Sequence, residues 1–212
     1  MFKKTFIHDI SLATRFVWDL FRLYRAQNNN EVAYYNVLFS IAIASEPMTI
    51  LELGTGPGIS SRAFIRALQY FNKIHSTQGF LHTCDVSAST IEPLAKQFGS
   101  LVIPHVMLTD DLVKGWVKHA TPIDILYIDA DHSHEQSLND FENFASFVIP
   151  NGLIIMHDTH PLSVEHEQHK YSGTVYKTAQ HIRNNYASEF ELMTIPYLCG
   201  ISLLRKKGSK YF

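Results

Sequence analysis

Short apolar runs alternate with segments of helical periodicity after Pro47, and this alternation limits the fold more than any other feature of the sequence. Strands that alternate with helices in this way predict an α/β domain with a mostly parallel sheet and helices on both faces. The strands are expected at residues 49–53, 80–85, 101–107, 123–129, 152–157, 190–195 and 200–205. Helices are expected between them at 60–71, 88–98, 111–118, 135–147 and 175–186.

The last two expected strands are separated only by a short turn at 197–200, so we predict an antiparallel hairpin at one side of the sheet. Two more helices are expected before the first strand, at 10–27 and 31–45. We expect one domain over 1–212, made of an N-terminal helical cap (1–46) and a core (47–207). Aromatic residues of the cap either pack against the sheet or a second subunit, or cover a bound ligand: Trp18, Phe21, Tyr34, Tyr35 and Phe39.

Charge and composition exclude several classes of protein. The formal net charge is −2, from 18 basic and 20 acidic residues, so no basic surface points to a nucleic-acid partner. The two cysteines, Cys84 and Cys199, lie in apolar, strand-like stretches and are expected to be buried and reduced. Neither a signal peptide nor a run of about 18 apolar residues is visible. From these absences we expect a cytoplasmic protein without a membrane span.

The stretch ILELGTGPG joins the first expected strand to a helix and carries three glycines, Gly54, Gly56 and Gly58. Glycine has no Cβ, so the chain can turn sharply there and its backbone can come close to a ligand. The spacing differs from the Gly-x-Gly-x-x-Gly of dinucleotide sites. Glu52, just before the loop, favours a ligand with a positive or hydroxyl-rich part. A tight turn without a ligand is the alternative.

Asp85 ends the second expected strand, at the edge of the sheet where open α/β folds bind their ligands. A carboxylate there can accept hydrogen bonds from two neighbouring ribose hydroxyls. The alternative is that Asp85 caps the next helix, although Ser87 competes for that position.

Taken in order, ELGTGPG, the acid of TCDVS, DILYIDADHSHE and PNGLIIMHDTHP resemble class I S-adenosylmethionine-dependent methyltransferases. Residues 49–206 most resemble small-molecule O-methyltransferases related to macrocin O-methyltransferase. The resemblance implies a Rossmann-like fold with a mostly parallel seven-stranded sheet and one antiparallel strand. It also implies that the glycine loop holds the methionine part of the cofactor, that Asp85 binds the ribose and that residues after the third strand contact adenine. The cofactor-binding residues are then Glu52, Gly54, Thr55, Gly56, Gly58, Ser60, Asp85, Val86, Thr109, Asp110 and Asp129.

The segment YIDADHSHE concentrates acids and histidines at the end of the fourth expected strand, a composition suited to a divalent cation. The resembling enzymes bind Mg²⁺ through an acid at the Asp129 position and two ligands after the fifth strand. Here these ligands are His157 and Asp158. Because the family usually has oxygen ligands at both places, His157 leaves the presence and identity of the metal open.

His132 matches the general base of the macrocin-type enzymes, and an imidazole suits this proton transfer near neutral pH. We therefore assign catalysis to His132 and Asp129; the alternative for His132 is a helix cap or a surface histidine. His160, His166 and His169 follow in a polar segment, where they are solvated or contact substrate or metal.

The expected reaction is methyl transfer to a hydroxyl of a small molecule, such as a sugar, a phenol or a natural-product intermediate. A nicotinamide-dependent oxidoreductase and a non-catalytic S-adenosylmethionine-binding protein are the alternatives. The aromatic surface of the cap makes a homo-oligomer plausible.

Overall fold

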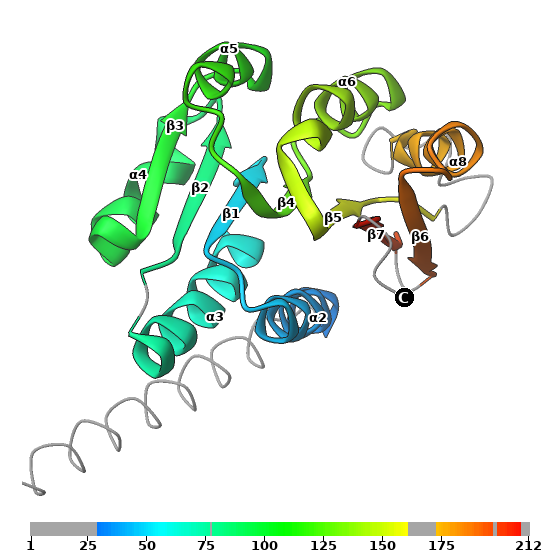
Figure 1. The fold of residues 1–212 in the computed structure, drawn as a ribbon. Helices are drawn as coiled ribbons and strands as arrows, with labels where there is room; N and C mark the ends of the chain where they lie inside the picture. Colours follow the sequence, from blue (N-terminus) through cyan, green and yellow to red (C-terminus); the bar gives the residue numbers. More distant parts are fainter. Residues whose placement is uncertain (1–28, 77, 161–172, 197–198, 209–212) are drawn as a thin grey trace, which may run out of the picture.

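The computed structural model describes residues 29–76, 78–160, 173–196 and 199–208. Its centre is a seven-stranded sheet in the order β3-β2-β1-β4-β5-β7-β6 (Figure 1). Every strand from β1 to β5 pairs in parallel with its neighbours among these five. The strands are β1 (Thr49–Leu53), β2 (Phe80–Asp85), β3 (Val102–Val106), β4 (Ile123–Ile128), β5 (Val148–His157), β6 (Phe190–Ile195) and β7 (Ile201–Lys206).

The predicted hairpin is present, because β6 and β7 pair antiparallel from Phe190↔Lys206 to Ile195↔Ile201. β7 also pairs antiparallel with β5. The strand that runs against the others is therefore β7, which lies between β5 and the edge strand β6. The predicted α/β fold with one antiparallel strand is confirmed.

Helices cover both faces of the sheet (Figure 1). α2, α3 and α4 bury one cluster of apolar side chains against it, including Leu38, Phe64 and Leu94. α5, α6 and α8 bury a second cluster on the opposite face, including Trp116 and Phe141. The central strands are covered on both sides and accordingly read as continuous apolar runs. The helices are α2 (Asn29–Ser45), α3 (Ile59–His75), α4 (Ala88–Phe98), α5 (Thr109–His119), α6 (His134–Phe144) and α8 (Val175–Asn185); two 3₁₀ turns are η1 (Gly99–Leu101) and η2 (Ala145–Phe147).

Among the strands, β5 differs most from its predicted bounds, because it begins at Val148 and not at residue 152. The sequence Pro150-Asn151-Gly152 resembles a turn, and Asn151 does adopt a positive φ of 66°. The chain nevertheless stays in the sheet through a register shift against β4 between Ile123 and Ile125. Turn-forming residues here produce an irregularity within one long strand.

Further expectations differ in detail or lie outside the described residues. The helix expected over 60–71 runs from Ile59 to His75. The helix expected over 135–147 ends at Phe144, and η2 follows it. Cys84 is buried in β2 as expected, but Cys199 lies in the turn before β7 and is partly exposed. The helix expected at 10–27 falls outside the described part of the chain, as do Trp18, Phe21, His166 and His169.

Among the described residues, no helix is both long and apolar enough to cross a bilayer. The cytoplasmic location, the absence of a nucleic-acid partner, the homo-oligomer and the domain bounds stay predictions from the sequence.

Candidate active site

The loop between β1 and α3 carries three glycines with positive φ, and each meets a different environment. A Cβ on Gly54 would lie 2.1 Å from the backbone oxygen of Asp129, so only glycine lets the ends of β1 and β4 meet this closely. A Cβ on Gly58 would touch Leu94 at 3.1 Å. At Gly56 a Cβ would meet nothing within 4 Å. Gly54 is thus needed for the close packing of β1 against β4, whereas Gly56 lies next to open space.

Glu52 lies beneath this loop, where its carboxylate is fully buried. It accepts hydrogen bonds from the hydroxyls of Ser60 (2.6 Å), Ser61 (2.5 Å) and Thr83 (2.5 Å). Burial raises the pKa of Glu52 to about 7, although the three hydroxyls act in the opposite direction. Thr83 donates to Glu52, so in the contact between Thr83 and Thr55 (2.7 Å) the donor is Thr55. Glu52 is therefore linked to the glycine loop by the hydroxyls of Thr83 and Thr55.

Asp85 is tied to the same loop from the side of β2. Its Oδ2 accepts hydrogen bonds from the backbone N–H groups of Thr55 and Gly56, both at 3.1 Å, and its Oδ1 accepts one from Ser87 at 2.9 Å. Carboxylates that accept backbone N–H bonds in this way fix the conformation of a loop. The residue expected to bind ribose thus also positions the glycine loop.

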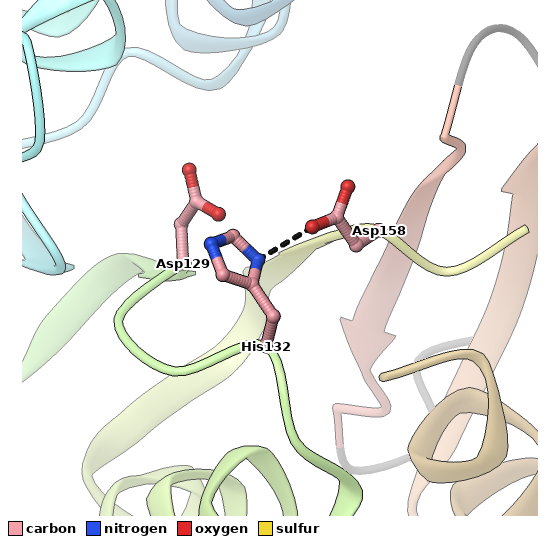
Figure 2. A group of neighbouring side chains, drawn as sticks. All are labelled: Asp129, His132 and Asp158. Carbon is pink, nitrogen blue, oxygen red and sulfur yellow. Dashed lines mark ion pairs between the residues drawn. The ribbon is translucent and has the colours of Figure 1, made fainter. Parts of the chain in front are cut away.

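Three side chains converge beyond the ends of β4 and β5: Asp129, His132 and Asp158 (Figure 2). Nδ1 of His132 lies 2.5 Å from Oδ2 of Asp158. The Asp158 side chain is only 3% exposed, whereas that of His132 is 44% exposed. The hydrogen bond to Asp158 raises the pKa of His132 against the opposing effect of burial. Asp158 has a φ of 56°, an uncommon conformation for a residue other than glycine and one that often marks functional positions.

Asp129 is held by two aromatic neighbours. Its Oδ2 accepts a hydrogen bond from the Tyr127 hydroxyl at 3.0 Å, and its Oδ1 lies 3.1 Å from Nδ1 of His157. The same His157 nitrogen is 3.2 Å from Oδ1 of Asp158. Although burial opposes it, the proximity of Asp129 and Asp158 raises the pKa of His157. His157 thus bridges the two carboxylates.

A cavity of about 350 Å³ is lined both by the glycine loop and by Asp129, His132 and His157. Its size falls within the range of small-molecule sites. The loop and the start of α3 contribute part of the wall, and α2, β4 with the loop after it, and the end of β5 contribute the rest. The lining residues are Tyr34, Leu38, Thr55, Gly56, Pro57, Ile59, Ser60, Tyr127, Asp129, His132 and His157.

Seven predicted cofactor residues do not line this cavity: Glu52, Gly54, Gly58, Asp85, Val86, Thr109 and Asp110. Thr109 donates a hydrogen bond to the buried Asp140 at 2.6 Å, and Asp110 accepts one from Asn139 at 2.6 Å, so both are engaged with α6. Val86 follows Asp85 and is 67% exposed. The cofactor roles of all the residues predicted from the sequence stay predictions.

The described residues contain one group of three acids and histidines whose donor atoms all lie within 4.8 Å of one another: Asp129, His132 and Asp158. Two carboxylates and an imidazole are suitable ligands for a divalent cation. In this group His132 stands where the sequence analysis expected His157. The assignment of His157 as a metal ligand stays a prediction.

Sequence reasoning missed two residues that shape this site. Tyr127 was counted only as part of an apolar strand, although it lies two positions before Asp129. Gly173 has a φ of 52°, and a Cβ on it would lie 1.7 Å from the backbone oxygen of His132. The next residue, Thr174, donates its backbone N–H to that oxygen at 2.7 Å. Only a contact between distant segments makes this glycine necessary, so no local signal could identify it.

Comparison with known families decides the class of protein. A family described as a methyltransferase domain matches residues 51–159, just over half of the 212 residues. The chain belongs to this methyltransferase family. The match runs from β1 through the glycine loop and the Asp129 segment to Thr159, and so includes every predicted site residue. The resemblance seen in the sequence is confirmed, and no comparison supports the nicotinamide-dependent oxidoreductase.

Solved structures of other methyltransferases share the fold. The O-methyltransferase TomG from Streptomyces achromogenes, involved in tomaymycin synthesis and crystallised with SAM, is 20% identical with a TM-score of 0.66, over 84% of this chain and 81% of TomG. The O-methyltransferase from Bacillus cereus, in complex with SAH, is 18% identical with a TM-score of 0.63, over 93% and 91%. SAH-bound PaMTH1 from Podospora anserina is 13% identical with a TM-score of 0.65, over 98% of both chains. No curated protein matches the sequence significantly.

Proposed function

We propose that this methyltransferase transfers a methyl group from S-adenosylmethionine to a hydroxyl oxygen of a small molecule, with His132 as the general base. The observation that carries the proposal is the pairing of His132, which lines the same cavity as the glycine loop, with the buried Asp158. An imidazole oriented by a buried carboxylate is a common arrangement for a general base. The structures of TomG and the Bacillus cereus enzyme, O-methyltransferases bound to SAM and SAH, support the choice of cofactor and acceptor atom.

The chain offers complementary groups for each part of this cofactor. The start of α3 borders the cavity and has no capping side chain, so its backbone N–H groups suit a carboxylate. Gly56 leaves open space for the amino-acid end. Asp85 is suited to the ribose hydroxyls. Beyond it, the exposed side chains of Val86 and Met107 offer an apolar surface for adenine.

S-adenosylmethionine supplies a methyl group on a sulfonium, which becomes a neutral thioether when an oxygen takes the methyl group. The acceptor hydroxyl must lose its proton in this reaction. With Nδ1 of His132 paired to Asp158, Nε2 is the nitrogen free to receive it. Asp158 then stabilises the imidazolium that forms. The walls of the cavity hold the two reactants in line, which is the main source of acceleration in such transfers.

A second candidate mechanism follows from the donor group of Asp129, His132 and Asp158. These residues would hold a divalent cation, which would lower the pKa of the acceptor hydroxyl. His132 would then be a ligand and unable to act as the base. The two mechanisms therefore exclude each other and differ in their response to a chelator.

The test is methyl transfer from S-adenosylmethionine carrying a labelled methyl group to a panel of phenols and glycosides, with excess EDTA or with added Mg²⁺. The base mechanism predicts activity in EDTA and a loss of about 10²-fold or more in His132→Asn. His119→Asn, at the exposed end of α5, is the matched control and should keep full activity. Activity only with Mg²⁺ would support the cation mechanism. Binding of S-adenosylhomocysteine without any transfer would support a non-catalytic binding protein.

A further inference from the structure

One nitrogen of His157 contacts both carboxylates of the site at once. Its Nδ1 lies 3.1 Å from Oδ1 of Asp129 and 3.2 Å from Oδ1 of Asp158. The oxygens of an ionised carboxylate only accept hydrogen bonds, so this nitrogen carries a hydrogen. That hydrogen is present both in the neutral tautomer protonated on Nδ1 and in the imidazolium, so the contact does not depend on the charge of His157.

The other oxygen of each carboxylate has a donor of its own. Oδ2 of Asp129 accepts a hydrogen bond from the Tyr127 hydroxyl at 3.0 Å, and Oδ2 of Asp158 lies 2.5 Å from Nδ1 of His132. All four carboxylate oxygens therefore face a donor within 3.2 Å. Mg²⁺ is bound in proteins mainly by carboxylate oxygens and water. To bridge Asp129 and Asp158, it would have to displace the N–H of His157.

His157 is held in this position from two sides. It is the last residue of β5, where it pairs with Ile201 of β7, and its ring stands edge-on to Tyr34 with 4.3 Å between the ring centroids. Its side chain also lines the cavity, whereas Asp158 does not. An ion in the cavity would therefore lie beside Asp129 and the two imidazoles, and not beside the carboxylate of Asp158.

We propose that His157 takes the place of a divalent cation in this site by linking Asp129 to Asp158 through its Nδ1–H. This inference rests on the proposed function and selects the first of its two mechanisms, in which no Mg²⁺ takes part. With Oδ1 of Asp158 held by His157, Oδ2 stays directed at His132. His157 is thus a positioning residue, which acts on the base through the carboxylate between them.

The test measures binding of Mg²⁺ by calorimetry and of Mn²⁺ by electron paramagnetic resonance. His157→Asp exchanges the N–H for an oxygen ligand beside Asp129 and Asp158. Wild type and Asp129→Ala should give the same binding curves, because no ion binds at Asp129 in wild type. His157→Asp should bind both ions at least about tenfold more tightly than wild type. His119→Asp, at the exposed end of α5, adds the same charge elsewhere and should bind them as wild type does.

The melting temperature gives a second measurement. Three neighbouring carboxylates repel one another, so His157→Asp should melt below wild type and recover when Mg²⁺ is added. The melting temperature of wild type should not respond to Mg²⁺. His157→Asn introduces an oxygen without a charge and should show a smaller gain in affinity for the two ions. It decides the question if His157→Asp does not fold.

Other outcomes separate this inference from the proposed function. Saturable binding of Mg²⁺ or Mn²⁺ by wild type that is lost in Asp129→Ala would overturn the role of His157, as would methyl transfer that stops in excess EDTA. Equal affinities of wild type and the folded His157 variants would overturn it too. Failure to bind S-adenosylhomocysteine would instead overturn the proposed function, whatever the ions do.

Discussion

The carboxylate of Asp158 holds the imidazole of His132, with Oδ2 2.5 Å from Nδ1. Asp158 is buried and His132 is partly exposed, so a charge fixed in the protein orients a ring that can reach a ligand. The proposed chemistry depends on this pair.

Asp158→Asn should lower kcat by about 10² to 10⁴-fold, because the imidazole loses both its orientation and its charge partner. The pH profile should change as well. The base works only when unprotonated, and the hydrogen bond to Asp158 raises the pKa of His132. The acidic limb of kcat/KM should therefore move to lower pH in the variant. Asp111→Asn, on the exposed side of α5, is the control. An unchanged acidic limb in Asp158→Asn would argue against His132 as the base.

Gly173→Ala should lower kcat by about tenfold or more while leaving the affinity for S-adenosylhomocysteine unchanged. The new Cβ would lie 1.7 Å from the backbone oxygen of His132, so the segment that carries the base must move. A displacement of about 1 Å in a catalytic group can cost up to two orders of magnitude in rate. Gly115→Ala is the control, because a Cβ there meets nothing within 4 Å. Equal kcat values for the two variants would contradict this role of Gly173.

Glu52→Gln should change how the free energy of unfolding depends on pH. Burial raises the pKa of Glu52 from 4.5 to about 7, so the folded state disfavours the charged form. At pH values between 4.5 and about 7 the unfolded chain loses this proton while the folded chain still holds it. The free energy of unfolding of wild type therefore falls as the pH rises through this range. The loss is on the order of 3 kcal/mol. Urea unfolding at pH 5 and pH 8 should show a smaller loss in Glu52→Gln than in wild type. An equal loss of unfolding free energy in the two proteins would contradict the raised pKa of Glu52.

The opposite dependence is expected at His82, on the other face of the sheet. Nδ1 of His82 lies 3.0 Å from Nε2 of His105, and Trp116 packs edge-on to the His82 ring. Burial, and then His105, lower the pKa of His82 from 6.5 to about 4. The unfolded chain therefore takes up the proton first as the pH falls from 6.5 to about 4, and the folded state is destabilised over that range. His82→Phe should lose less stability than wild type between pH 7 and pH 5, measured by urea unfolding.

Most of the fold could be predicted from the sequence because its signals are local. The bounds of β1, β2 and α4 were predicted to the residue, since each has a clear apolar pattern between turn-forming residues. The start of β5 was not, because Pro150-Asn151-Gly152 has the composition of a turn and only pairing with β4 keeps it in the sheet.

The candidate site was predictable in composition but not in geometry. Asp129, His132 and Asp158 follow strands whose ends meet at one edge of the sheet, so their convergence could be expected. The close contact between His132 and Asp158 could not be predicted, because it depends on the positive φ of Asp158 and on the path of the loop after β4.

Calorimetric titration of the full chain with S-adenosylhomocysteine is the most direct test of the central claim, which is that the cavity beside the glycine loop binds this class of nucleoside. We expect micromolar binding to wild type, and at least about tenfold weaker binding to Gly56→Val, because Gly56 lines the cavity with a φ of 47° that a β-branched residue disfavours. NAD should not bind. Absence of binding by S-adenosylhomocysteine, or tighter binding of NAD in its place, would contradict the assignment of this cavity to the cofactor.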